Sequence, residues 1–134
     1  MRIDGDDSFL ELERSDLGPS STPADRDVLL NVTVRVAGYS AADQAWVPDE
    51  QLNAFVTELR LLESSRKGQA TLTGALPDDL RLEFYAVDSL GHMAVRGHLG
   101  WNHPHGFLLQ LRFGFDFEPD RLPALLRYFE TIRQ

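Results

Sequence analysis

The chain has 134 residues, 43% hydrophobic and 25% charged, which fits one compact domain over residues 1–134 with a core of its own. It contains no cysteine, which excludes disulfides, thiol nucleophiles and cysteine metal sites. The formal net charge of −8 argues against nucleic-acid binding, which depends on neutralising phosphates, and favours encounter with basic partners.

The chain opens with MRIDGDDSFLELE, an acidic start without the apolar segment of a signal peptide. No stretch of the sequence approaches the roughly 18 continuous apolar residues that a membrane span needs. We therefore expect a cytoplasmic protein that does not enter a membrane.

Three strands are predicted in the first part of the chain. Residues 8–14 form a short strand, and residues 28–38 alternate apolar and polar side chains as a half-buried strand does. Residues 41–46 suit a short edge strand. Residues 15–27 are rich in Gly, Pro, Ser and Asp, which is typical of a loop.

Two segments have the period of amphipathic helices. The first covers about residues 48–64, with Pro48 at its first position, and ends before Gly68. The second covers about residues 120–132, with Asp120 as its N-cap. The apolar stripes of the two helices are Leu52, Phe55, Val56, Leu59 and Leu62, and then Leu122, Leu125, Leu126, Phe129 and Ile132.

Four further strands are predicted between the helices, at residues 69–75, 80–87, 92–99 and 107–117. Their short connections favour an antiparallel meander. The sheet, of about five to seven strands, and the two helices packed on one of its faces give a two-layer α+β domain. The expected core face of this sheet consists of Leu82, Phe84, Met93, Val95, Leu99, Leu109, Leu111, Phe113 and Phe115.

Three of the four histidines fall in the segment HLGWNHPHGF, which makes a metal site the first hypothesis for it. Imidazole is a common metal ligand, so a small metal-dependent enzyme centred on residues His98–His105 is one alternative for function. No cysteine or carboxylate lies close by in the sequence to complete such a site, and Pro104 with the flanking glycines is typical of a turn. We interpret the segment as a strand connection, with His98 at a strand end, and predict no metal, cofactor or catalytic residue.

A second candidate cation site is the acidic string Asp116, Glu118 and Asp120. It lacks the spacing of a calcium loop. We assign Asp120 to helix capping and the other two carboxylates to a solvent-exposed strand end.

The residues that alternate with the core set form a polar face rich in arginine. Arg81, Tyr85, Arg96, His98 and Arg112 are predicted to lie on it and to bind a protein partner. Arginine pairs bidentately with carboxylates, and tyrosine is a frequent anchor in interfaces. The alternatives are a solvated face held by cross-strand pairs such as Arg81 with Glu83, and a face that pairs with a second copy in a homodimer.

Two segments, NVTVRVAGYSAADQAWVPDEQLNAFVTELRLL and FGFDFEPDRLPALLRYFETI, resemble the WapI-like family of small bacterial immunity proteins and domains of unknown function. The resemblance covers about residues 8–132. The residues that carry it are Trp46, Pro48, Leu52, Phe55 and Leu59 in the first segment, and Pro119, Leu122 and Leu126 in the second.

The resemblance implies a protein that binds and neutralises a cognate toxin and is not an enzyme. It carries over no catalytic or contact residues. A self-associating structural domain stays the main alternative. The loop over residues 15–27, with Asp16, Asp25 and Asp27, is a second surface that could meet a basic toxin.

Overall fold

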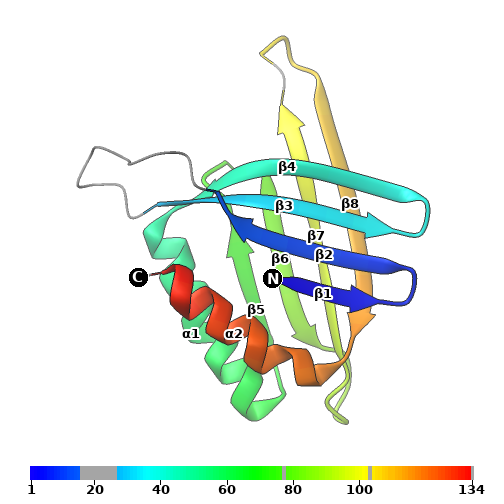
Figure 1. Ribbon diagram of the computed structural model, residues 1–134, viewed down its shortest axis with the longest axis vertical. Helices are drawn as coiled ribbons and strands as arrows, with labels where there is room; N and C mark the ends of the chain where they lie inside the picture. Colours follow the sequence, from blue (N-terminus) through cyan, green and yellow to red (C-terminus); the bar gives the residue numbers. More distant parts are fainter. Residues whose placement is uncertain (16–26, 77, 103, 134) are drawn as a thin grey trace.

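The computed structural model describes residues 1–15, 27–76, 78–102 and 104–133. Its strands form two antiparallel four-stranded sheets, and two helices complete the domain (Figure 1). Sheet A consists of β1 (Arg2–Gly5), β2 (Ser8–Arg14), β3 (Val28–Val36) and β4 (Tyr39–Val47), in that order. Sheet B consists of β5 (Gln69–Thr73), β6 (Leu80–Ala86), β7 (Met93–Asn102) and β8 (Leu108–Phe117). The helices are α1 (Asp49–Ser65) and α2 (Leu122–Ile132), the latter preceded by the 3-10 turn η1 (Pro119–Arg121).

The α+β class, the antiparallel pairing and the two helices are confirmed. The strands, however, divide into two sheets, and β1 adds one strand to those expected. The division follows the order of the chain, because α1 separates β4 from β5; in the described residues the strand ladders join β1 to β4 and β5 to β8 separately. Alternation shows which side chains are buried, but it does not show which strands pair.

Both the helices and sheet A cover the same face of sheet B. On this face α1 contacts β5 and β6, whereas sheet A lies toward the opposite edge of sheet B, where β1 and β3 contact β8 and β4 contacts β7. Figure 1 shows the strands of sheet A crossing in front of those of sheet B, with the helices beside them. The core therefore lies between sheet B on one side and sheet A with the two helices on the other.

The ends of the helices differ slightly from the expected ones. Pro48 has an extended backbone (φ −62°, ψ 147°) and is the N-cap of α1, not its first helical residue. The prediction of Asp120 as the cap of α2 is wrong, because Asp120 lies inside η1 and α2 follows Arg121. The cause is the 3-10 turn, in which the Arg121 N–H donates to the Glu118 carbonyl at 3.0 Å. None of the helices in the described ranges is long and apolar enough to cross a membrane.

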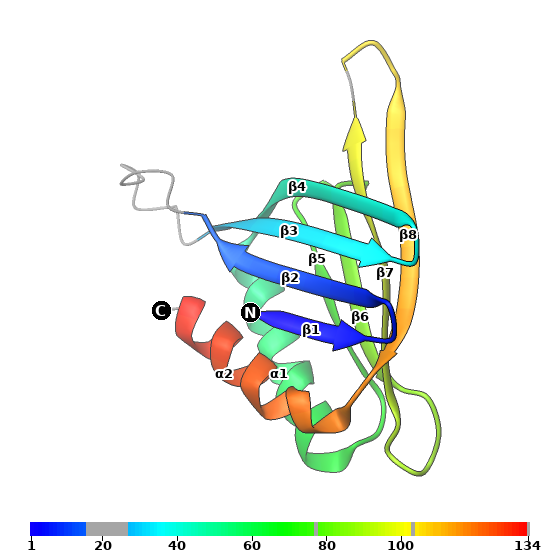
Figure 2. The same ribbon diagram turned by 45° about the vertical axis from the view of Figure 1, so that its right-hand side comes forward.

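One predicted core residue is largely exposed. Leu109 is 66% exposed, whereas Leu111, Phe113 and Phe115 are half-buried against the core. The reason is the length of the β7–β8 hairpin, whose tip projects beyond β4 and out of the cover of sheet A (Figure 2). The alternation along β8 does place Leu109 on the core-facing side of the strand, but sheet A does not extend far enough to bury it.

Candidate partner-binding surfaces

The structure places all five predicted partner-binding residues on the face of sheet B that points away from the core. We call this surface, made of Arg81, Glu83, Tyr85, Arg96, His98 and Arg112, the outer face. His98 of β7 lies directly between Arg81 of β6 and Arg112 of β8 in the ladder. The Arg96 guanidinium carbon lies 4.3 Å above the centre of the Tyr85 ring.

Glu83 is the buried residue of the outer face, and it binds two of the arginines on this face. It is only 8% exposed, and its carboxylate accepts a hydrogen bond from Arg96 Nη2 at 2.7 Å. Its second oxygen lies 3.7 Å from Arg81 Nη2, so Arg81 and Glu83 do pair, but along β6 and not across strands, and the cross-strand partner of Glu83 is Arg96. The hydrogen bond to Glu83 and its charge raise the pKa of Arg96 above its ordinary value. Arg96 is thus held in place by Glu83 and Tyr85.

Arg112 is bound less tightly, with one hydrogen bond from its Nε to Gln110 Oε1 at 3.1 Å. It lies on β8, the last strand of sheet B. Of the arginines on this face, Arg112 is therefore the one that a partner could engage without breaking the contacts of Glu83.

His98 lies inside β7 opposite Arg112, not at a strand end, because β7 continues to Asn102. His105 belongs to the turn beyond Asn102, and His103 lies outside the described residues. The strand from His98 to Asn102 spans about 13 Å at roughly 3.3 Å per residue, so the ladder separates His98 from the turn that carries His105. No three His, Asp or Glu side chains gather in a metal-binding group in the described part of the chain.

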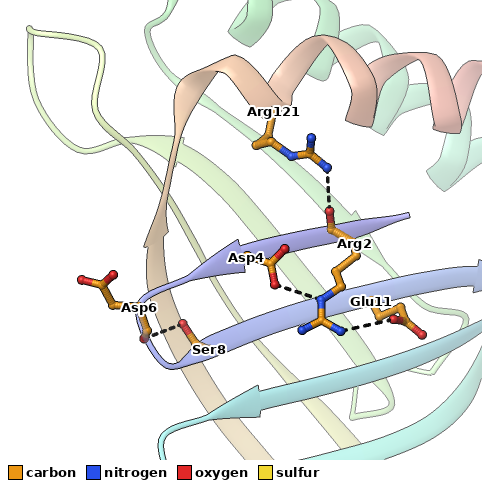
Figure 3. Close-up of polar contacts among 6 residues, drawn as sticks. All are labelled: Arg2, Asp4, Asp6, Ser8, Glu11 and Arg121. Atoms are coloured by element: carbon orange, nitrogen blue, oxygen red, sulfur yellow. Dashed lines mark hydrogen bonds and ion pairs between the residues drawn. The ribbon is translucent and has the colours of Figure 1, made fainter.

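Sequence reasoning missed a cavity of about 620 Å³ beside the β1–β2 turn and the end of β8. We call it the acidic cavity, because its charged lining consists of Asp4, Asp6, Asp88, Asp116, Glu118 and His92. Asp116 and Glu118 belong to the acidic string noted in the sequence, but the other residues come from distant segments. Close by, Arg2 contacts Asp4 at 2.9 Å and Glu11 at 3.9 Å (Figure 3).

His92 at the edge of the acidic cavity forms an ion pair with Asp88, at 2.6 Å between Nδ1 and Oδ2. Asp88 Oδ1 also accepts the backbone N–H groups of Leu90 and His92. The hydrogen bond to Asp88 raises the pKa of His92, and the same bond lowers the pKa of Asp88. The sequence signal was the segment DSLGH, in which an Asp four residues before a His can bond back to it across a turn.

A third surface is a groove of about 340 Å³ between β4 and the projecting β7–β8 hairpin. We call it the hairpin groove. Ser40, Ala41, Ala42 and Asp43 line one side, and Leu99, Gly100, Trp101, Leu109, Gln110 and Leu111 line the other. Trp101 is 46% and Leu109 66% exposed. Exposed apolar side chains gathered in one groove are typical of an interaction surface.

The acidic loop that we considered as a rival surface is described only at its ends. Asp27 is exposed, and its Oδ1 accepts the backbone N–H of Asp49 at 3.2 Å. Asp16 and Asp25 lie outside the described residues.

Comparison with known proteins gives one match to a family and one to a curated protein. The model of the Immunity protein WapI-like family matches residues 1–134. Sperm flagellar protein 2 of Rattus norvegicus is 27% identical over 81 residues, which are 60% of this chain. The aligned region spans only 4% of the length of that relative. No solved structure matches the chain.

Proposed function

Because the chain belongs to the WapI-like immunity protein family, we propose that it is a cytoplasmic binding protein that neutralises a cognate bacterial toxin. The observation that carries this proposal is the family match, which includes every residue from 1 to 134. An immunity protein acts by occupying its toxin one-to-one, so it needs no catalytic residue, metal or cofactor of its own. Neither nucleic acid nor a membrane has a part in this mechanism.

The charge of the protein supports a toxin with a basic surface. The net charge is −8, and five carboxylates line the acidic cavity. Complementary charge speeds the encounter of two proteins and disfavours partners of the wrong sign. We therefore assign long-range attraction of the toxin to the side of the molecule that bears the acidic cavity.

We further propose that the outer face contacts the bound toxin through Arg81, Tyr85, Arg96, His98 and Arg112. Tyrosine and arginine dominate the energetics of many interfaces. The hydrogen bond between Arg96 and Glu83 supports this, since an arginine that is already ordered loses less side-chain entropy on binding. The positive charges of this face suit carboxylates on the otherwise basic toxin.

The test is rescue of growth in cells that express a toxin domain encoded beside this gene. Co-expression of this chain should restore growth, and titration calorimetry of the purified pair should give one-to-one binding. If this chain restored growth at an amount well below one molecule per toxin molecule, the result would indicate an enzyme. Failure to bind or rescue against the adjacent toxin would contradict the proposal.

A further inference from the structure

We propose that the hairpin groove receives an extended segment of the toxin, which adds a strand to sheet A along β4 and places a basic side chain beside Asp43, Asp78 and Asp79. This inference rests on the proposed function and names a second contact with the toxin, separate from the outer face. It is a case of strand addition, in which main-chain hydrogen bonds supply affinity and side-chain pockets supply specificity.

The first observation is the open edge of β4. The carbonyl of Trp46 points away from β3, because it accepts the N–H of Ala75 at 2.8 Å. Alternate residues of an antiparallel strand point the same way, so the backbone groups of Ser40, Ala42 and Gln44 also face outward. The Gln44 N–H is bonded by Asp43 Oδ1 at 2.8 Å. Within the described ranges nothing bonds to the outward groups of Ser40 and Ala42.

Two of the other edge strands, β1 and β5, each carry a side-chain hydrogen bond at the edge. At β1, Arg121 Nη2 donates to the carbonyl of Arg2 at 3.1 Å (Figure 3). At β5, Glu58 of α1 accepts the N–H of Thr71 at 3.1 Å. An uncovered edge is a template for pairing with another chain, and the small side chains of Ser40, Ala41 and Ala42 leave β4 accessible.

The second observation is the apolar wall that faces this edge. The β7–β8 hairpin projects past β4, as Figure 2 shows, and presents Trp101 and Leu109 beside it. A strand added to β4 would direct every second side chain toward this wall. The segment that fits is therefore extended, with apolar residues at alternate positions.

The third observation is negative charge at one end of the groove. Burial together with the charges of Asp43 and Asp78 raises the pKa of Asp79, so both of these carboxylates lie close enough to Asp79 to repel it. The Asp79 carbonyl accepts the N–H of Gly100, which itself lines the groove. A lysine or arginine at the end of the added strand would relieve this repulsion.

The same charges disfavour a second copy of this chain as the occupant. If two β4 edges paired across a two-fold axis, the Asp43 groups and their acidic neighbours would be brought together. Like charges across an interface oppose association. A basic segment of the toxin has the complementary sign.

The test uses a synthetic probe and the full isotope-labelled chain. The probe is a blocked octapeptide of alternating valine and threonine with a lysine at each end. Its binding is measured at millimolar concentrations from the amide chemical shifts of the protein. We expect shifts at Ser40 and Ala42 and at the Trp101 indole. A probe with glutamates at its ends should bind more weakly.

Two variants check the geometry. Ala42→Pro removes one outward N–H without touching the β3–β4 ladder and should weaken the probe about fivefold. Leu109→Ser should weaken it as well, whereas Leu61→Ser, at a 63% exposed position of α1, is the matched control and should have no effect. Unfolding in urea establishes that each variant is folded.

Several results would overturn the inference. The inference is wrong if the probe causes no amide shifts, or if the shifts are confined to the β8 edge at Gln110–Gly114. It is also wrong if the Ala42→Pro variant binds the probe as well as the wild type does. A dimer in sedimentation that Ala42→Pro abolishes would show that a second copy occupies the groove instead. The proposed function fails separately. If the wild-type chain rescues growth and the Ala42→Pro and Leu109→Ser variants rescue equally well, the groove is excluded and the immunity function stands.

Discussion

The Phe129 ring of α2 meets the Phe55 ring of α1 edge-on, with centroids 4.8 Å apart and ring planes inclined at 79°. Both side chains are 0% exposed. Phe55 also lies 5.8 Å from the ring of Phe84 on β6, so three aromatic rings join the two helices to sheet B. This contact makes α2, the last helix of the chain, part of the central core.

Phe129→Ala should therefore lower the free energy of unfolding by about 3–5 kcal/mol, the usual cost of deleting a buried phenylalanine. Domains of this kind have about 5–15 kcal/mol in total, so the variant should be marginal at best. Leu61→Ala, at an exposed position of α1, is the control and should change stability by less than about 0.5 kcal/mol. A loss below about 1 kcal/mol for Phe129→Ala in urea titration would contradict this packing.

Gly97→Ala should destabilise the domain because no space exists for a methyl group in the middle of β7. A Cβ at this position would lie 1.9 Å from the Arg81 carbonyl oxygen of β6. Overpacking of this kind costs about 1–3 kcal/mol or more. Gly38→Ala is the matched control, since a Cβ there meets nothing within 4 Å. Equal midpoints of thermal unfolding for the two variants would show that β6 and β7 separate easily.

The Asp88–His92 ion pair should make stability depend on pH in two ranges. The pKa of His92 is raised from 6.5 in the folded protein, so its contribution is complete below 6.5 and is lost as pH rises through the raised value. The pKa of Asp88 is lowered from 3.8, so its contribution is present above 3.8 and is lost as pH falls through the lowered value. Asp88→Asn should return the His92 pKa toward 6.5 in an NMR titration. An unchanged His92 pKa in that variant would exclude the ion pair.

Neutralising the acidic cavity should slow association with a basic toxin. Asp6→Asn/Asp116→Asn should reduce the association rate at low salt and have little effect at high salt, because screening removes long-range attraction. The control is Glu13→Gln/Glu50→Gln, which removes the same charge elsewhere on the surface. Stopped-flow measurements over a range of salt concentrations compare the two. Equal slowing by both pairs would show that only net charge matters.

Substitutions on the outer face should separate binding from stability. Arg112→Ala should change stability by less than about 0.5 kcal/mol and weaken toxin binding, by about 2 kcal/mol or more if it is a hot spot. Arg96→Ala should instead destabilise the fold, because it removes the 2.7 Å hydrogen bond to the buried Glu83 and leaves Arg81, at 3.7 Å, as the ion-pair partner of Glu83 among the described residues. Adding Glu83→Gln to Arg96→Ala should recover part of that loss in urea titration. Normal toxin affinity for Arg112→Ala and Tyr85→Ala would exclude this face as the contact surface.

The local patterns of the sequence were sufficient for both helices, for every strand except β1, and for the faces of the central strands of sheet B. Helical spacing around Phe55 and Phe129 identified both helices, and alternation along β6 and β7 placed Arg81, Tyr85 and Arg96 on one face. These features depend on the repeat of side-chain directions along a helix or strand, and that repeat is set locally, by residues close together in the sequence. The acidic string at Asp116 and Glu118 was also visible, although not the cavity that it helps to line.

Only the tertiary structure decided how the elements assemble. The division into two sheets, the exposure of Leu109 and the groove beside Ala42 all depend on where sheet A ends relative to the β7–β8 hairpin. The meeting of Asp4 and Asp6 with Asp88 and Asp116 depends on the contact of β1 with β8. Such relations join residues far apart in the sequence, and they follow from the burial of whole faces, which no local period in the sequence encodes.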